Sequence, residues 1–283
     1  MGFKCGIVGL PNVGKSTLFN ALTRTAAAQA ANFPFCTIEP NVGEVAVPDP
    51  RLEKLAAIAH SAQIIPARMS FVDIAGLVKG ASKGEGLGNQ FLANIRECDA
   101  VIYVLRCFED DNIVHVAGRV DPIADAEIVE TELMLADLES LEKRVTGLEK
   151  KAKQGDKDAK LVLGLVEQAL ALLREGKPAR HVTRTTPEEE KAFAELQLLT
   201  AKPALYVCNV DEAAAATGNE WTRKVEEYAK SHAAAVVVIS AEIESQLAQL
   251  PEDEQREYLA SLGLSEPGLN RLIREGYQLL GLL

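Results

Sequence analysis

The segment Gly9–Ser16 carries the residue types that hold a polyphosphate, because its sequence GLPNVGKS fits the pattern G-x-x-x-x-G-K-[ST]. Gly9 and Gly14 let backbone N–H groups turn inward around phosphates, and the N-terminus of a following helix adds its positive dipole end. Lys15 can reach the β- and γ-phosphates, and the Ser16 hydroxyl can ligate Mg²⁺. The spacing predicts a nucleoside triphosphate site. The other residues that we expect to bind the nucleotide here are Asn12, Val13 and Thr17.

The segments on either side of this loop can position it. Lys4–Val8 is a short apolar run typical of a buried strand, and Thr17–Thr23 is typical of a helix. The order strand, glycine loop, helix is the context that the motif needs. A glycine-rich turn that binds nothing would not require it, so the flanking segments favour the phosphate-binding interpretation.

A second chemical motif follows another apolar run. Asp73 comes directly after it, in the sequence Asp-Ile-Ala-Gly that ends at Gly76. An aspartate at the end of a buried strand can hold Mg²⁺ through its water shell, and the backbone N–H of Gly76 can approach the terminal phosphate. Alone, the motif would equally fit an aspartate that caps a turn. Together with the phosphate loop, it indicates nucleoside triphosphate binding.

Short apolar runs and helical stretches alternate along the chain. The runs that we expect to form strands are residues 5–8, 69–72, 100–105, 203–208 and 235–239. This alternation predicts an α/β fold with a parallel, doubly wound sheet, which binds ligands at the carboxyl ends of its strands. Residues 252–283 are expected to be helical.

Residues 125–200 interrupt this alternation and are rich in Ala, Leu, Glu and Lys. Two apolar stripes with spacings of three and four flank a polar segment at 150–158, and they predict an antiparallel coiled-coil hairpin that needs no further partner to fold. Two ordinary helices packed on the sheet remain the alternative. We therefore expect a nucleotide-binding domain at 1–124 and 201–283, with the hairpin inserted at 125–200. The stripe residues are Met134, Leu138, Leu141, Val145 and Leu148, then Val162, Leu165, Ala169 and Leu172.

Composition limits the classes of partner and compartment. The 283 residues carry a net charge of −11, which argues against binding DNA through bulk charge. The five cysteines include no C-x-x-C pair, as expected for reduced thiols. No leader precedes the first strand, and no apolar run approaches the ~20 residues that span a bilayer. We therefore expect a cytoplasmic protein without a membrane partner.

Three segments in order, Gly9–Ser16, Asn32–Asn41 and Asp73–Ala81, resemble the YchF family of Obg-like ATPases, in the translation-factor-related class of P-loop GTPases. The resemblance extends over essentially the whole chain. It implies a G domain, with Thr37 as a switch threonine that ligates Mg²⁺ together with Ser16 and Asp73. It also makes the ribosome or its RNA the expected partner. Family members usually continue into a C-terminal TGS domain, and this sequence ends where that domain would begin. Either the sequence is cut there or this version lacks the domain, so functions of that domain are in doubt here.

The base-recognition motif departs from that of ordinary GTPases. They carry Asn-Lys-x-Asp, whereas this chain has Asn209-Val210-Asp211-Glu212. Glu212 is longer by one methylene than the aspartate that accepts two guanine hydrogen bonds, and Val210 removes the lysine that packs over the base. The resemblance implies a preference for ATP, with Asn209 and Val210 near the base. Alternatively, Asp211 is the guanine-binding acid displaced by one position. The expected loop on the other side of the base is Ser240, Ala241 and Glu242.

The group that activates water is not evident. Many GTPases carry a glutamine after the Asp-x-x-Gly motif, but Leu77 occupies that position and cannot orient water. Slow basal hydrolysis is expected, accelerated by a partner, by K⁺ held at Asn12, or by a side chain that moves in. His115 is one candidate, and a structural histidine is the alternative. Lys15, Gly76 and His115 form the expected catalytic set.

We therefore expect a P-loop switch protein that hydrolyses ATP to ADP and phosphate. A GTPase of the same fold and a non-hydrolysing, nucleotide-dependent scaffold are the alternatives. The polar turn of the hairpin adds a possible contact with RNA phosphates, because it is basic in an acidic chain. A solvated turn kept for solubility is the competing interpretation. The charged residues of the turn are Lys150, Lys151, Lys153, Lys157 and Lys160, against Asp156 and Asp158.

Overall fold

The structure is a computed structural model that describes residues 3–30, 41–74, 87–110 and 119–282. The chain divides into two compact units. The first comprises residues 1–74, 98–125 and 204–283, and the second comprises residues 75–97 and 126–203. No helix within the described ranges is long and apolar enough to cross a membrane.

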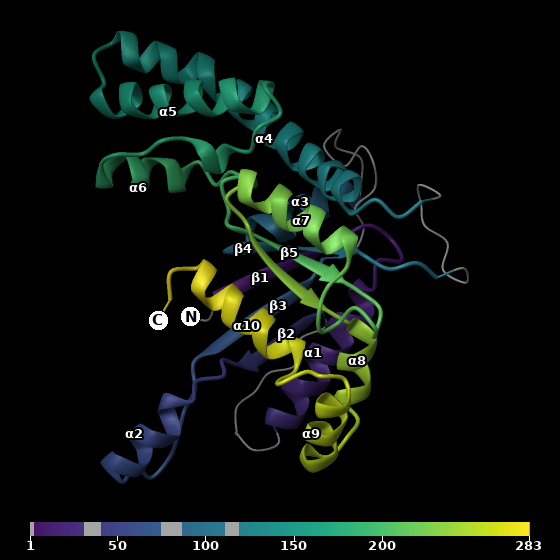
Figure 1. Cartoon of the computed structure of the whole chain (residues 1–283). Helices are drawn as coiled ribbons and strands as arrows, with labels where there is room; N and C mark the ends of the chain where they lie inside the picture. Colours follow the sequence, from purple (N-terminus) through teal and green to yellow (C-terminus); the bar gives the residue numbers. More distant parts are fainter. Residues whose placement is uncertain (1–2, 31–40, 75–86, 111–118, 283) are drawn as a thin grey trace. The chain divides into compact units, whose positions relative to one another are not determined.

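The first unit contains a six-stranded sheet in the order β2-β3-β1-β4-β5-β6 (Figure 1). The five predicted strands are present and pair in parallel, and an edge strand that we did not predict, β2, pairs antiparallel with β3. The strands are β1 (Phe3–Val8), β2 (Val42–Ala46), β3 (Arg68–Asp73), β4 (Ala100–Arg106), β5 (Ala204–Asn209) and β6 (Ala235–Ile239).

The central strands are apolar along almost their whole length, because both faces of a parallel sheet are covered. Every residue of β4 and β5 is buried. The only charged residue in these two strands is Arg106, and it stands at the carboxyl end of β4 beside Asn209, at the carboxyl end of β5. The charged and amide side chains of β4 and β5 therefore lie at the carboxyl ends of these two strands.

Of the helices of the first unit, α1, α7 and α10 pack on the sheet and α8 packs on α1. α1 lies beside α8 and contacts β2 and β3, whereas α7 and α10 contact β5 and β6. α10 lies across the sheet in Figure 1, and a Cβ added at Gly276 would be 3.1 Å from the Met69 side chain of β3. The helices are α1 (Lys15–Ala30), α2 (Arg51–Ala59), α7 (Glu220–Ser231), α8 (Ala241–Leu247), α9 (Glu252–Ser261) and α10 (Gly268–Leu279). The last two form the expected helical C-terminal part.

The second unit is helical. It contains α3 (Leu87–Arg96), most of α4 (Pro122–Lys153), α5 (Lys157–Arg174), a 3₁₀ turn η2 (Ala179–His181) and α6 (Pro187–Glu195). α4 and α5 are joined by the short polar turn that the sequence predicts. Gly155 in this turn has a φ of +91°, and the Asp156 side chain caps α5 by accepting a hydrogen bond from Ala159 N at 3.0 Å.

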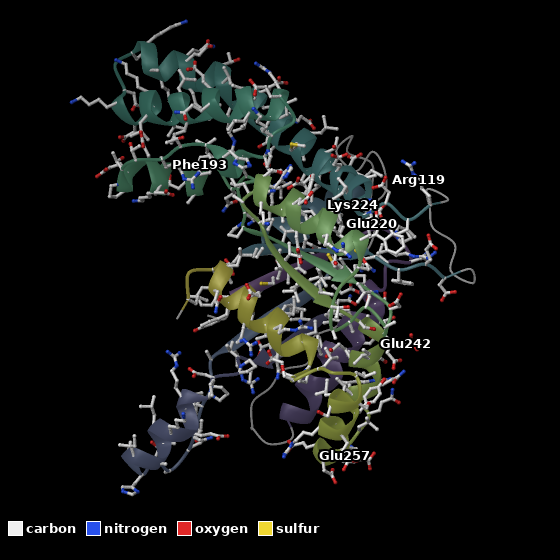
Figure 2. The ribbon with its side chains drawn as sticks, in the orientation of Figure 1. Arg119, Phe193, Glu220, Lys224, Glu242 and Glu257 are labelled. Carbon is white, nitrogen blue, oxygen red and sulfur yellow. The ribbon has the colours of Figure 1, made fainter. Side chains whose placement is uncertain are left out.

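The core of this unit is broader than the predicted two-helix seam. Leu141, Leu165 and Ala169 of the seam are buried, and Phe193 of α6, labelled in Figure 2, is buried in the same cluster. The predicted seam is therefore part of a larger core that also includes α6. α5 buries a wide stripe rather than a narrow one, so α6 packs on it in addition to the facing helix. The buried residues of this stripe are Leu165, Val166, Ala169, Leu170 and Leu173.

Two buried polar contacts hold the segment after α6 and the 3₁₀ turn against α4. The Asp137 carboxylate accepts hydrogen bonds from Leu199 N and Thr200 N, each at 2.8 Å. Burial raises the pKa of Asp137 above its ordinary value. Arg180 of η2 forms a buried ion pair with Glu130 of α4. A buried charge is tolerated only when it is paired or hydrogen-bonded in this way.

Candidate nucleotide-binding site

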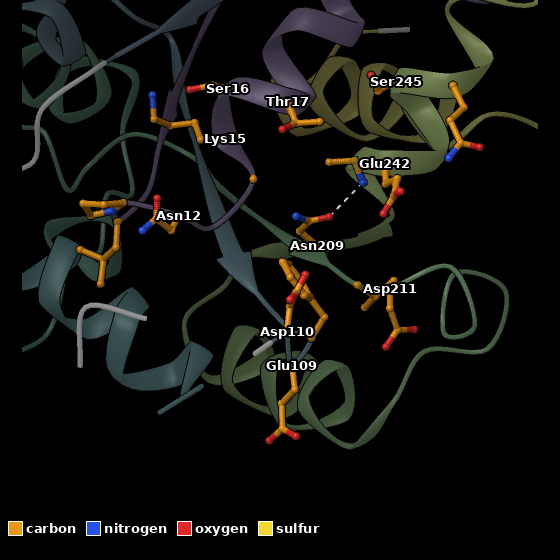
Figure 3. Close-up of a pocket in the computed structure, with 17 residues that line it drawn as sticks. Asn12, Lys15, Ser16, Thr17, Glu109, Asp110, Asn209, Asp211, Glu242 and Ser245 are labelled. Atoms are coloured by element: carbon orange, nitrogen blue, oxygen red, sulfur yellow. Dashed lines mark hydrogen bonds between the residues drawn. The ribbon is translucent and has the colours of Figure 1, made fainter. Parts of the chain in front are cut away.

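A pocket of about 740 Å³ lies at the carboxyl ends of the strands of the first unit (Figure 3). This volume is in the range typical of small-molecule sites. Four segments of the chain line the pocket, and they follow β1, β4, β5 and β6 in turn. The lining residues are Leu10–Asn12 and Gly14–Thr17, Phe108–Asp110, Asn209–Asp211, and Ala241, Glu242, Ser245 and Gln246.

The phosphate loop needs its glycines for two different reasons. Gly14 has a φ of +90°, a conformation that side chains disfavour, and a Cβ there would lie 2.1 Å from Nδ2 of Asn209. A Cβ at Gly9 would lie 2.7 Å from the Val104 carbonyl oxygen. Asn12 also adopts a left-handed conformation, with a φ of +64°. The loop therefore turns sharply before α1 begins at Lys15, so the N-terminus of α1 opens into the pocket.

Asn209 joins two of the four lining segments. Its Nδ2 donates to the Val13 carbonyl oxygen at 2.9 Å, and its Oδ1 accepts from Ala241 N at 2.9 Å, the dashed line in Figure 3. The residue is only 4% exposed. Its amide therefore braces the phosphate loop against the loop that follows β6.

Lys15 and Asp73 form an ion pair between the start of α1 and the end of β3. Ser16 is exposed beside Lys15 and lines the pocket. A serine hydroxyl and an aspartate carboxylate are oxygen donors of the kind that Mg²⁺ prefers. The described part of the chain has no group of three or more His, Cys, Asp or Glu residues that could hold a metal. The donor set therefore fits an ion held jointly by the protein, phosphates and water.

Comparison with known proteins decides the family. The model of a family described as "50S ribosome-binding GTPase" matches residues 4–150. The "Ribosome-binding ATPase YchF" of Haemophilus influenzae is 55% identical over 282 residues, which is 100% of this chain and 77% of the relative. The chain belongs to the YchF family.

Further relatives agree with this assignment. The YchF protein of Bacillus subtilis is 52% identical over 284 residues, again covering 100% of this chain and 77% of the relative. A solved structure, that of the Schizosaccharomyces pombe YchF GTPase, is similar with a TM-score of 0.84 and 36% identity. That likeness covers 99% of this chain and 76% of the solved one. The α/β fold expected for a G domain of this family is thereby confirmed.

Of the expected base-side residues of this YchF chain, some line the pocket and others lie outside its lining. Val210, Asp211, Ala241 and Glu242 line the pocket. Glu212 is not among the lining residues, and Asp211 Oδ1 accepts a hydrogen bond from Ala214 N at 2.8 Å.

Two other expected ligands have side chains directed elsewhere. Ser240 is buried and caps α8, with its Oγ accepting from Ile243 N at 3.5 Å. Val13 is 0% exposed and is not among the lining residues. Both can therefore contribute to the pocket only through the backbone. In Val13 the carbonyl is already hydrogen-bonded to Asn209.

Five lining residues beyond the phosphate loop were missed by the sequence analysis. Phe108, Glu109 and Asp110 follow β4, and the rule that ligands bind at the carboxyl ends of strands could have indicated them. Ser245 and Gln246 lie one helical turn after Ala241 and Glu242 on α8. Helical spacing from the predicted base-side loop could have indicated these two.

α8 is held in place through its buried residue Glu244. The buried Glu244 carboxylate accepts hydrogen bonds from Gly268 N at 2.7 Å and Leu269 N at 3.3 Å, at the start of α10. Burial raises the pKa of Glu244 to about 7, although these two hydrogen bonds act in the opposite direction. The wall formed by α8 is therefore tied to the sheet through α10. Thr37, Gly76, Leu77 and His115 lie outside the described residues.

Proposed function

We propose that this chain is a Mg²⁺-dependent ATPase that acts as a nucleotide-controlled switch. The observation that carries the proposal is the convergence of Lys15, Ser16 and the left-handed Gly14 on one pocket of nucleotide size. The names of the YchF relatives, which include ribosome-binding ATPases, support the same reaction.

Each residue of the phosphate end has a distinct part in this proposal. The N–H groups from Asn12 to Thr17 bind phosphate oxygens, and the Lys15 ammonium neutralises charge on the β- and γ-phosphates. Ser16 and Asp73 would hold Mg²⁺, with Thr37 as a further ligand. When bound, Mg²⁺ stabilises the charge that develops on the phosphates.

We propose slow basal hydrolysis, since Leu77 cannot orient water. Gly76 would contribute its N–H to the terminal phosphate. K⁺ held at Asn12, which lines the pocket in a left-handed conformation, or His115 would accelerate the reaction. A partner that supplies the missing group is the other route.

ATP is the proposed nucleotide because Glu212, at the position of the guanine-reading carboxylate of ordinary GTPases, does not line the pocket. Asp211 does line it, but its Oδ1 already accepts a hydrogen bond from Ala214 N. Phe108 is half-buried in the pocket lining and offers an aromatic face to a purine. The second candidate is GTP, because the matching family model and the similar solved structure are both described as GTPases.

We expect ATP to bind more tightly than GTP in calorimetric titrations of the purified chain with Mg²⁺. The double variant Val210→Lys with Glu212→Asp should raise GTP affinity, because it restores the packing lysine and the shorter acid. GTP binding tenfold tighter than ATP, about 1.4 kcal/mol, would contradict the proposal. Phosphate release measured with both nucleotides separates an ATPase from a GTPase, and binding without release would indicate a scaffold.

We propose that the ribosome is the partner and that residues 125–200 form a separate inserted domain that contacts it. Lys150, Lys151 and Lys153 are exposed at the end of α4. Next to this turn lies a groove of about 420 Å³ whose lining includes Lys143 and Arg144. A basic surface on a chain of net charge −11 suits RNA phosphates.

Replacing Lys150, Lys151 and Lys153 with glutamate should weaken co-sedimentation with ribosomes and flatten its salt dependence, because fewer counterions are then released on binding. ATP hydrolysis by the free chain should not change. The matched control replaces three exposed lysines of the first unit, Lys54, Lys224 and Lys230, with glutamate. If both variants sediment like the wild type at low and high salt, the turn is not the contact.

Consistent with a ribosomal partner, we propose a cytoplasmic location, with neither DNA nor a membrane as partner. The acidic net charge of −11 makes non-specific DNA binding unfavourable.

A further inference from the structure

Arg106 is a buried charge at the end of the central strand β4. It is only 2% exposed. Its Nε donates to the Phe108 carbonyl oxygen at 3.1 Å, and its Nη2 donates to the Asp110 carbonyl oxygen at 3.3 Å. The centre of its guanidinium also lies 4.8 Å from the centroid of the Phe108 ring, within cation–π distance. These contacts stabilise the buried guanidinium charge. They also hold the loop after β4, which contains Phe108 and Asp110, in place.

The loop concerned, residues 107–110, is the wall of the pocket that follows β4. Its first residue is held by neighbouring segments, since Cys107 N donates to Asn209 O at 2.8 Å and Asn219 Nδ2 donates to Cys107 O at 2.7 Å. Phe108 and Asp110, which line the pocket, are held by Arg106. Arg106 therefore holds the loop after β4 in place, as Asn209 holds the phosphate loop and the loop after β6.

We propose that Arg106 is a positioning residue for the purine: it holds the Phe108 ring on the pocket wall before the nucleotide arrives. This inference rests on the proposed binding of a nucleotide in this pocket. Without the guanidinium, the nucleotide itself would have to order the loop, and that ordering reduces affinity. Lysine cannot replace arginine here, because a compact ammonium cannot reach two carbonyls and stack on a ring at once.

The test measures ATP and a ligand without a base on the same variants. In Arg106→Met and Arg106→Lys, the KM for ATP should rise roughly tenfold, and kcat at saturating ATP should fall far less. The Kd for Mg²⁺–tripolyphosphate should match that of the wild type, because the phosphate loop is intact. If Arg106 had only a structural role, its replacement would weaken the binding of ATP and of tripolyphosphate to the same extent. Arg274→Met, which removes an arginine paired with Glu266 outside this pocket, is the control.

A double-mutant cycle shows whether Arg106 acts through Phe108. Phe108→Ala should raise the KM for ATP, and adding Arg106→Met should raise it little further. Additive effects, a parallel loss of tripolyphosphate affinity, or wild-type KM values in the Arg106 variants would overturn the inference. If Arg106→Met does not fold, Arg106→Lys and Phe108→Ala carry the test. If the pocket did not bind nucleotides at all, the result would look different, because the wild type would then bind neither ATP nor tripolyphosphate.

Discussion

Lys15→Ala should reduce ATP turnover by at least about a hundredfold, the effect expected when a preorganised donor to the transition state is removed. In the proposed reaction, the Lys15 ammonium neutralises charge as the terminal phosphate departs. In the structure it pairs with Asp73, so we infer that Mg²⁺–ATP exchanges this ion pair for contacts with phosphate and metal. Single-turnover phosphate release at saturating Mg²⁺–ATP measures the loss at the chemical step.

Two further variants isolate the cause of that loss. Ser16→Ala should weaken the dependence of ATP binding on Mg²⁺ while Lys15 stays in place. Lys54→Ala removes the same charge from the exposed side of α2 and should hydrolyse ATP like the wild type. Wild-type turnover in Lys15→Ala would mean that this loop does not hold the reacting phosphates.

Gly14→Ala should abolish nucleotide binding and lower the free energy of unfolding by about 2–4 kcal/mol, from backbone strain and broken hydrogen bonds. The new Cβ would lie 2.1 Å from Nδ2 of Asn209 at a φ of +90°. Asn209 would have to release Val13 or Ala241, so two lining segments would separate. Urea denaturation measures the stability, and calorimetry measures ATP binding.

Gly263→Ala is the matched control for this prediction. Gly263 belongs to the same unit and has a φ of +71°, but a Cβ there would meet nothing within 4 Å. It should show only the cost of the left-handed backbone, about 1–2 kcal/mol, and should bind ATP normally. If the two variants behave alike, the contact between Gly14 and Asn209 does not brace the pocket.

The phosphate loop and the parallel strands could be predicted because their signals are local. Gly14 and Lys15 occupy fixed places in one short motif, and the buried strands are continuous apolar runs. β2 escaped prediction because its sequence, Val-Gly-Glu-Val-Ala, contains a glycine and a glutamate and is not a continuous apolar run. α6 escaped as a core element because its sequence is mostly charged and buries only Phe193.

The roles of Asn209 and Arg106 could not be predicted, for two different reasons. The partners of Asn209 are distant in sequence, and the burial of Arg106 is unusual for an arginine. Asn209 and Val13 are 196 positions apart, and only the fold brings them together. The local motif indicated a residue near the base, whereas the amide braces two loops. Arg106 at the end of a strand would ordinarily be exposed to water. Its burial depends on the carbonyls of the loop that follows.

The brace at Asn209 has an evolutionary consequence. Both of its partners are backbone atoms, the carbonyl of Val13 and the amide of Ala241, and every amino acid supplies a carbonyl while all but proline supply an amide. Substitutions at Val210 or Glu212 would therefore leave both bracing hydrogen bonds in place. If these positions set the nucleotide preference, as we propose, that preference can change in evolution while the loops stay where they are.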